Sequence, residues 1–129
     1  MDSSALFALL DEDDQRHRDA MAWLAGPGQD PDVILVSHNY VIIESAALAV
    51  RRLGIDAVRV LLNAFVPALS VLYVDEHLHL SAVSAYLGAG ARRPSLVDRV
   101  SFEMMRSLGI SAAFAFDRDF QAQGFTTVP

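Results

Sequence analysis

The chain has 129 residues, of which 53% are hydrophobic, and its 16 acidic residues against 10 basic ones give a formal net charge of −6. This length is typical of one domain with a sizeable core. The sequence holds neither cysteine nor lysine, which excludes disulfide frameworks, thiolate zinc sites, P-loops and covalent catalysis by lysine. The acidic balance also argues against binding nucleic acid by bulk charge, so any such role needs a local site.

The sequence carries no recognisable membrane or export signal. No uninterrupted apolar run approaches the roughly 18 residues that a spanning helix needs. The first four residues contain no basic region followed by an apolar stretch, so the pattern does not predict a signal peptide. We therefore expect a cytoplasmic protein.

Apolar residues at helical spacing, together with capping residues, predict six helices. The acidic run 11–14 places negative charge at the positive end of the second helix. Ser37 or Asn39 is expected to cap the third helix, which runs to about residue 53, and Ser95 is expected to cap the last. The other helices are expected at residues 4–10, about 14–25, 56 to about 65 and 76–87, and the last one ends at residue 108.

Short runs rich in apolar and β-branched residues predict four strands. The run 33–36 is wholly apolar, as is typical of a central strand covered on both faces, whereas 126–128 has the weaker pattern of an edge strand. The other strands are expected at 71–74 and 112–116. Because helices separate the strands, we expect parallel pairing with right-handed crossovers, and thus an α/β fold of three layers, helix-sheet-helix, with a mostly parallel central sheet.

Glu44 is the only charged residue between positions 40 and 50, and most of its neighbours at helical spacing are apolar. A carboxylate in these surroundings is expected to be partly buried. Burial of an unpaired charge is costly, so we expect Glu44 to be protonated, paired with an arginine or bound to a cation. Taken alone, the residue is also explained by a structural ion pair or by a helix edge that faces solvent.

Asp117 follows directly after the predicted strand 112–116, and Asp119 lies two residues further on. The carboxyl ends of parallel strands are where ligands bind, but a turn or a helix cap explains an aspartate there as well. Asp98 forms a capping box with Ser95, which is a complete structural explanation for this acid. Taken singly, none of these residues predicts a function.

The remaining candidates also have ordinary structural explanations. Asp2 precedes the first predicted helix and is expected to cap it. His77 and His79 point to different faces of a helix, so surface placement is favoured over metal binding. The sequence names no partner for His17 or His38.

Taken jointly and in order, the acidic residues change this interpretation. They occur in four segments: DSSAL at 2–6, IES at 43–45, SLVDRVS at 95–101 and AFDRDF at 115–120. This ordered set resembles the PIN-domain ribonucleases of the bacterial VapC toxin type. The resemblance covers essentially the whole chain, including the closing segment 124–129, and the ordered set is much more specific than any single member.

The resemblance implies a catalytic site at the carboxyl edge of a parallel sheet. It implies that four acids converge there and bind Mg²⁺ or Mn²⁺: Asp2, Glu44, Asp98 and Asp117. It also implies that Asp119 is an accessory acid and that Ser3 or Ser4 orients the site by hydrogen bonding.

In one respect the chain departs from the family pattern. PIN domains normally carry a hydrophobic strand ahead of the first aspartate, whereas only Met1 precedes Asp2 here. We therefore expect a single PIN-like domain over residues 1–129 whose first strand is missing or truncated. In that case the helix after Asp2 would have to hold the carboxylate in place.

Physical chemistry supports a metal at such a site. Carboxylates gathered within a few ångströms repel one another, so without a cation at least one would take up a proton. Hard oxygen ligands without histidine or thiolate select Mg²⁺ or Mn²⁺ over Zn²⁺. A bound metal would activate water for in-line attack on an RNA phosphodiester, and the family pattern implies a 5′-phosphate and a 3′-hydroxyl as products.

Recognition of RNA and of partner proteins would use other residues. The arginines that flank Asp98 are candidates for phosphate contacts, although solvent-facing arginine explains them equally well: Arg92, Arg93 and Arg99. The resemblance also implies a VapB-like antitoxin and a homodimer, and the apolar faces of the first two helices are candidate contact surface for the antitoxin: Phe7, Leu10, Trp23 and Leu24.

Two alternatives to a ribonuclease remain open at this stage. The departure at the first strand suggests a PIN-like module that has lost catalysis and binds protein or RNA. A metal-dependent phosphatase or DNA nuclease could also use the same acidic site.

Overall fold

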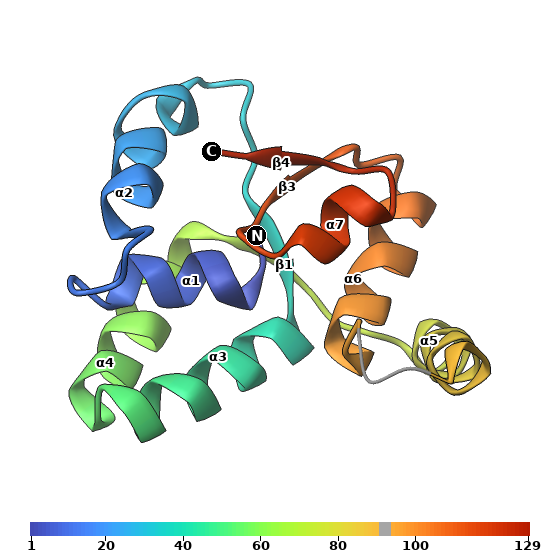
Figure 1. Ribbon diagram of the computed structural model, residues 1–129. Helices are drawn as coiled ribbons and strands as arrows, with labels where there is room; N and C mark the ends of the chain where they lie inside the picture. Colours follow the sequence, from blue (N-terminus) through green and yellow to red (C-terminus); the bar gives the residue numbers. More distant parts are fainter. Residues whose placement is uncertain (91–93) are drawn as a thin grey trace.

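A computed structural model describes residues 1–90 and 94–129 (Figure 1). Its α-helices are α1 (Ser3–Leu10), α2 (His17–Ala25), α3 (Asn39–Arg52), α4 (Ile55–Val60), α5 (Glu76–Ala89), α6 (Leu96–Ser107) and α7 (Arg118–Ala122). Its strands are β1 (Val36–His38), β2 (Ser70–Leu72), β3 (Ala112–Phe114) and β4 (Thr126–Val128). None of the helices within these described ranges is long and apolar enough to cross a membrane.

The strands lie in the middle of the molecule, between two groups of helices (Figure 1). In that view α1, α2 and α4 lie to the left, α5, α6 and α7 lie to the right, and α3 runs below. β1 pairs with β2 and β3 pairs with β4, and both pairs are parallel. The predicted parallel pairing and helix-sheet-helix arrangement are therefore confirmed, but the described strands form two two-stranded sheets and not one central sheet.

The first two residues bridge the two strand pairs. The Met1 ammonium donates a hydrogen bond to the carbonyl of Val36 in β1, and the Ser37 hydroxyl donates to the carbonyl of Met1 at 2.9 Å. On the other side, the backbone N–H of Asp2 donates to the carbonyl of Phe114 in β3 at 3.0 Å. A cavity of about 450 Å³ adjoins Met1 between the same two strands. Met1 is thus bonded to β1, and Asp2 is bonded to Phe114, the last residue of β3.

Apolar packing on both sides of the strands supplies the core. On one side Phe114 packs with the small residues of α1, and the Trp23 ring of α2 lies 4.7 Å from the Phe114 ring. On the other side Phe102 of α6 meets Phe120 of α7 edge-on at 5.0 Å. This packing fixes α6 and α7 beside β3, which places their N-terminal ends close together.

The first strand was predicted at 33–36, and this prediction was wrong: β1 is Val36–His38, and Ile34 is 73% exposed rather than covered on both faces. The ladder with β2 begins at the pair Val36 and Ser70. A β-branched run without a paired neighbour stays irregular, because strand propensity describes a fit to neighbouring strands more than a backbone preference.

The cap predicted for α3 was also wrong, because His38 and not Ser37 or Asn39 is the N-cap. The Ser37 hydroxyl is engaged by Met1, as described above, and the Asn39 side chain accepts a hydrogen bond from the backbone N–H of Val74 at 2.9 Å. Both side chains are therefore used in tertiary contacts. Tertiary bonds of this kind cannot be read from local spacing.

Helix α2 begins at His17, three residues later than predicted. The carboxylates of Asp11 and Asp14 accept hydrogen bonds from the backbone N–H groups of Asp13 and Arg16, at 3.1 and 2.7 Å. Short acidic side chains of this kind stabilise turns at the expense of helix, which explains the late start. The helix predicted to run to about residue 65 is α-helical only to Val60 and continues as a π-helix over Leu61–Phe65. The other predicted elements have boundaries within about two residues of the observed ones.

The fold predicts the effect of removing one buried hydroxyl. Ser45 in α3 is fully buried, and among the described residues its Oγ has no hydrogen-bond partner. We expect Ser45→Ala to raise the free energy of unfolding by about 1 kcal/mol, because it removes an unsatisfied polar group. Ser37→Ala is the matched control: it removes a hydroxyl that bonds to Met1, so it should lower the same quantity by about 1 kcal/mol. Urea titration measures both, and equal losses in the two variants would contradict the argument.

Candidate metal centre

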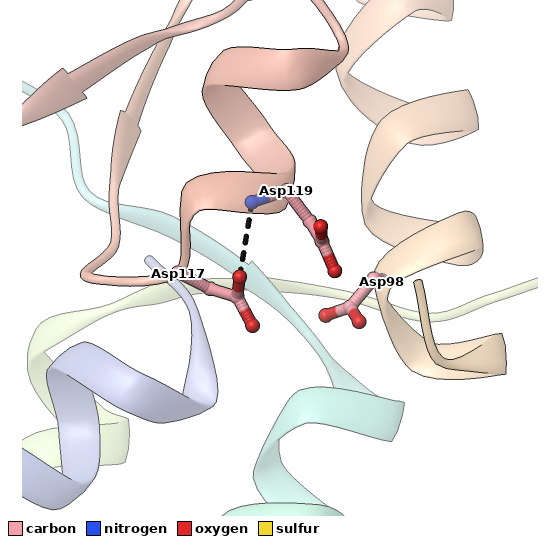
Figure 2. A group of neighbouring side chains, drawn as sticks. All are labelled: Asp98, Asp117 and Asp119. Carbon is pink, nitrogen blue, oxygen red and sulfur yellow. Dashed lines mark hydrogen bonds between the residues drawn. The ribbon is translucent and has the colours of Figure 1, made fainter. Parts of the chain in front are cut away.

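Three aspartates from the C-terminal part of the chain meet in one place (Figure 2). Asp98 lies in the first turn of α6, Asp117 precedes α7, and Asp119 lies in its first turn. One carboxylate oxygen from each can be chosen so that all lie within 4.8 Å of one another. Figure 2 shows the three side chains directed into the space between α6 and α7.

Helix capping places two of these acids. Asp98 and Ser95 form the predicted capping box: the carboxylate of Asp98 accepts from the backbone N–H of Ser95 at 2.7 Å, and the Ser95 hydroxyl accepts from the N–H of Asp98 at 3.1 Å. Asp117 is the N-cap of α7, and its Oδ1 accepts from the N–H of Asp119 at 2.9 Å. A cap engages one oxygen of a carboxylate, so capping and metal binding are compatible in the same side chain.

Asp2 is not one of the three acids that lie within 4.8 Å of one another, but its charge acts on Asp98, and Ser4 holds its carboxylate. The Oδ2 atom of Asp2 accepts from the backbone N–H of Ser4 at 3.0 Å and from its hydroxyl at 2.7 Å. The same hydroxyl accepts from the backbone N–H of Phe116 at 3.0 Å. Since Phe116 directly precedes Asp117, Ser4 connects the start of α1 to the segment that carries the second acid.

Asp98 is only 9% exposed, so its negative charge is poorly solvated. Burial raises the pKa of its carboxyl from 3.8 to about 6, and the charges of Asp2 and Asp117 act in the same direction. The hydrogen bonds from Ser95 favour the charged form but do not outweigh burial. Without a cation, this carboxyl therefore holds a proton at mildly acidic pH.

Carboxylate oxygens without hydrogen-bond partners make the acidic group suitable for a cation. Within the described part of the chain, Oδ1 of Asp2 and Oδ2 of Asp119 are buried and have no hydrogen-bond partner. Buried acceptors without a donor are rare and call for a water or an ion. Because every donor atom here is a carboxylate oxygen, the set is suited to a hard divalent cation such as Mg²⁺ or Mn²⁺.

The structure does not bring every predicted site residue into the cluster. Glu44 is half-buried in α3, as expected, but it is not part of the group within 4.8 Å. Ser3 opens α1, whereas Ser4 makes the contacts to Asp2. Arg99 lies next to Asp98, with a buried Nε that has no hydrogen-bond partner among the described residues. The two other candidate arginines, Arg92 and Arg93, lie outside the described residues.

One side chain close to this region was left without a role by the sequence. His38 is buried at the carboxyl end of β1, where its ring contacts Ser101 of α6. A histidine that directly follows a strand could have been noticed, because ligand sites gather at that edge of a parallel sheet. No local pattern names Ser101 as its partner, since 63 residues separate the two.

Comparison with known families gives one match over nearly the whole chain. The family model of the PIN domain matches residues 1–125. The matched range includes all five acids discussed above, from Asp2 to Asp119.

Comparison with individual proteins agrees with the family match. The chain is 35% identical, over 132 aligned positions, to a protein of Mycobacterium tuberculosis named "23S rRNA-specific endonuclease VapC20", recorded in two strains, with 99% of this chain and 95% of that protein covered. The crystal structure of Mycobacterium tuberculosis VapC20, described as a sarcin-ricin loop cleaving toxin, is similar with a TM-score of 0.86 and 32% identity. That similarity covers 97% of this chain and 94% of the other.

The raised pKa of Asp98 predicts how the metal-free protein responds to pH. Folding raises this pKa from 3.8 to about 6, so the folded state holds the proton more tightly and stability is lost as the pH rises from about 4 through 6. In EDTA at pH 7.5, Asp98→Asn should therefore be more stable than the parent by on the order of 1–2 kcal/mol. This gain should disappear at pH 3.5.

Denaturant titration at the two pH values measures this difference. Asp19→Asn is the matched control, because Asp19 is exposed in the first turn of α2 and lies outside the cluster. A gain from Asp98→Asn that is the same at both pH values would contradict the electrostatic explanation.

Proposed function

The chain belongs to the PIN domain family, and on this premise we propose that it is a divalent-metal-dependent endoribonuclease, the toxin of a bacterial type II toxin-antitoxin pair. The observation that carries the proposal is the meeting of Asp98, Asp117 and Asp119 beside Asp2. Nearly the full length of the chain aligns with a protein named as an RNA endonuclease, which supports RNA as the substrate.

The proposed metal ligands are the four acids of the family pattern, with Asp119 as the accessory acid: Asp2, Glu44, Asp98 and Asp117. Bound Mg²⁺ or Mn²⁺ would activate water and stabilise the charge that develops on the phosphoryl and leaving oxygens. The residues of the chain orient these ligands. Ser4 holds Asp2, the capping box holds Asp98, and the start of α7 holds Asp117.

The proposed substrate contact is Arg99. Its guanidinium group follows Asp98 in the first turn of α6, and its Nε has no partner among the described residues. A guanidinium group can donate two parallel hydrogen bonds to a phosphate, which would attract RNA locally in an otherwise acidic protein. Arg92 and Arg93 precede it in sequence and remain candidates for the same role. Because the similar protein is named for 23S rRNA, this is the first substrate to test.

The proposed partners are a VapB-like antitoxin and a second copy of the chain, in the cytoplasm of a bacterium. Of the predicted antitoxin contacts on α1 and α2, Trp23 and Leu24 pack against the core and so are partly used within the domain. Large apolar side chains are exposed on α3 and α4, among them Ile43 and Ile55. Apolar surface of this kind is typical of protein contact sites, which supports a protein partner.

The nuclease proposal predicts loss of cleavage when one ligand is neutralised. Asp98→Asn and Asp117→Asn should each reduce RNA cleavage by at least about 100-fold in Mg²⁺ or Mn²⁺, because each removes a charged oxygen ligand. Asparagine keeps an acceptor for the helix cap, so both variants should remain folded by circular dichroism. Full activity in either variant, or in excess EDTA, would refute the proposal.

Metal titration separates this function from its alternatives. Calorimetry with Mn²⁺ should show binding to the parent protein, and an absence of binding at millimolar Mn²⁺ would favour a catalytically inactive interaction module. Parallel assays with RNA, single-stranded DNA and small phosphate esters separate a ribonuclease from a DNA nuclease and a phosphatase. Preferential cleavage of RNA is the expected result.

The role of Arg99 predicts a change in RNA affinity. Arg99→Gln should raise the KM for RNA several-fold and reduce the salt dependence of binding by about one phosphate contact. Arg59→Gln is the matched control, since Arg59 is exposed on α4 and already paired with Asp56. Equal effects of the two substitutions on binding to a catalytically inactive variant would mean that Arg99 makes no specific phosphate contact.

A further inference from the structure

His38 begins a short chain of hydrogen bonds that runs from β1 to α6. The residue is 3% exposed and ends β1. Its Nε2 lies 2.8 Å from the hydroxyl of Ser101 in α6, and that hydroxyl donates to the carbonyl of Val97 at 3.2 Å. Val97 directly precedes Asp98, so the chain of bonds ends at the helical turn that carries this acid.

The pattern of donors fixes the protonation state of the ring. Nδ1 accepts from the backbone N–H of Val41 at 3.4 Å, so the proton of a neutral ring lies on Nε2 and is donated to Ser101. The Ser101 hydroxyl is then free to donate its own proton to Val97. Burial lowers the pKa of the imidazole to about 4, and the N-terminal ammonium acts in the same direction. The ring is therefore neutral at physiological pH, as this arrangement requires.

Asp98 depends on such a link more than the other acids do. Asp2 is bonded to β3 through its backbone, and Asp117 follows β3 closely along the chain. Asp98 comes from a helix that packs beside the strands, chiefly through the apolar side chains of Phe102 and Met105. Apolar packing has no preferred direction, whereas a hydrogen bond constrains both distance and angle.

We propose that His38 is a positioning residue for the metal centre: through Ser101 it fixes the first turn of α6, and with it Asp98, relative to the carboxyl end of β1. This inference rests on the proposed function, because it assigns His38 a role in binding the divalent cation. The same ring caps α3, the helix that carries Glu44. One buried side chain at the end of β1 thus contacts both the start of α3 and the first turns of α6.

Two substitutions separate the roles of the two ring nitrogens of His38. In His38→Asn the side-chain oxygen can replace Nδ1 and keep the cap of α3, but the shorter side chain cannot reach Ser101. In His38→Gln the amide nitrogen can replace Nε2 and retain that bond. We expect His38→Asn to raise the Kd for Mn²⁺ by on the order of 10–100-fold, as is usual for residues that orient metal ligands, and His38→Gln to have a much smaller effect.

Ser101→Ala tests the same link from its other end. It should weaken Mn²⁺ binding to a similar degree, and the double variant of His38→Asn with Ser101→Ala should bind no more weakly than the single variants, because both remove one interaction. This substitution removes only one oxygen atom, so it keeps the test decisive if His38→Asn does not fold. His17→Asn is the matched control for His38→Asn, because the His17 ring makes a tertiary hydrogen bond, to the carbonyl of Ala8 at 2.8 Å, but lies outside the cluster.

The measurements are calorimetry with Mn²⁺ alone and thermal unfolding in EDTA. A merely structural role would lower the Tm of the His38→Asn and Ser101→Ala variants and leave the Kd for Mn²⁺ unchanged, as expected for His17→Asn, and that result would overturn the inference. If the parent protein itself does not bind Mn²⁺, the proposed function fails and this inference fails with it. Binding by the parent and unchanged binding by both variants refutes the role of His38 alone.

Discussion

Repulsion between the carboxylates that gather at the N-terminal ends of α6 and α7 is the constraint around which this molecule is organised. Each of three acids begins a helix or caps its first turn: Asp2 at α1, Asp98 at α6 and Asp117 at α7. The N-terminal end of a helix carries partial positive charge and free N–H donors, which offset negative charge nearby. The remaining buried oxygens of Asp2 and Asp119 have no donor among the described residues, so they are available as ligands for a divalent cation.

Capping and the proposed metal binding are therefore compatible uses of the same side chains. The sequence predicted a capping box between Ser95 and Asp98, which by itself accounts for an aspartate at this position, and the structure contains that capping box. The box also turns the carboxylate toward Asp117 and Asp119. A side chain that is fixed by a backbone hydrogen bond loses little further freedom when it binds a metal, which favours tight and directional binding.

Hydrogen bonds at the start of the chain fix the position of Asp2 relative to the strands. Met1 and Asp2 bond to β1 on one side and to β3 on the other, so the two strand pairs are connected through the residues that lead into α1. Ser4 extends this connection to the backbone next to Asp117, and His38 extends it to α6. Polar contacts between distant segments thus surround the acids, while apolar packing supplies most of the core.

The sequence by itself determined the fold class and the family, and it singled out Asp98, Asp117 and Asp119, which the structure brings together. The sequence shows these through local features: alternating helical and strand patterns, the caps at Asp2 and Ser95, and the ordered acidic segments. Such features can be recognised without knowing which distant residues are in contact. The tertiary structure alone decided where β1 lies, that Ser37 and Asn39 bond to Met1 and Val74 rather than cap α3, and that His38 bonds to Ser101. These outcomes depend on partners 35 to 63 residues away, and a hydrogen bond across such a distance leaves no periodic signal in the chain.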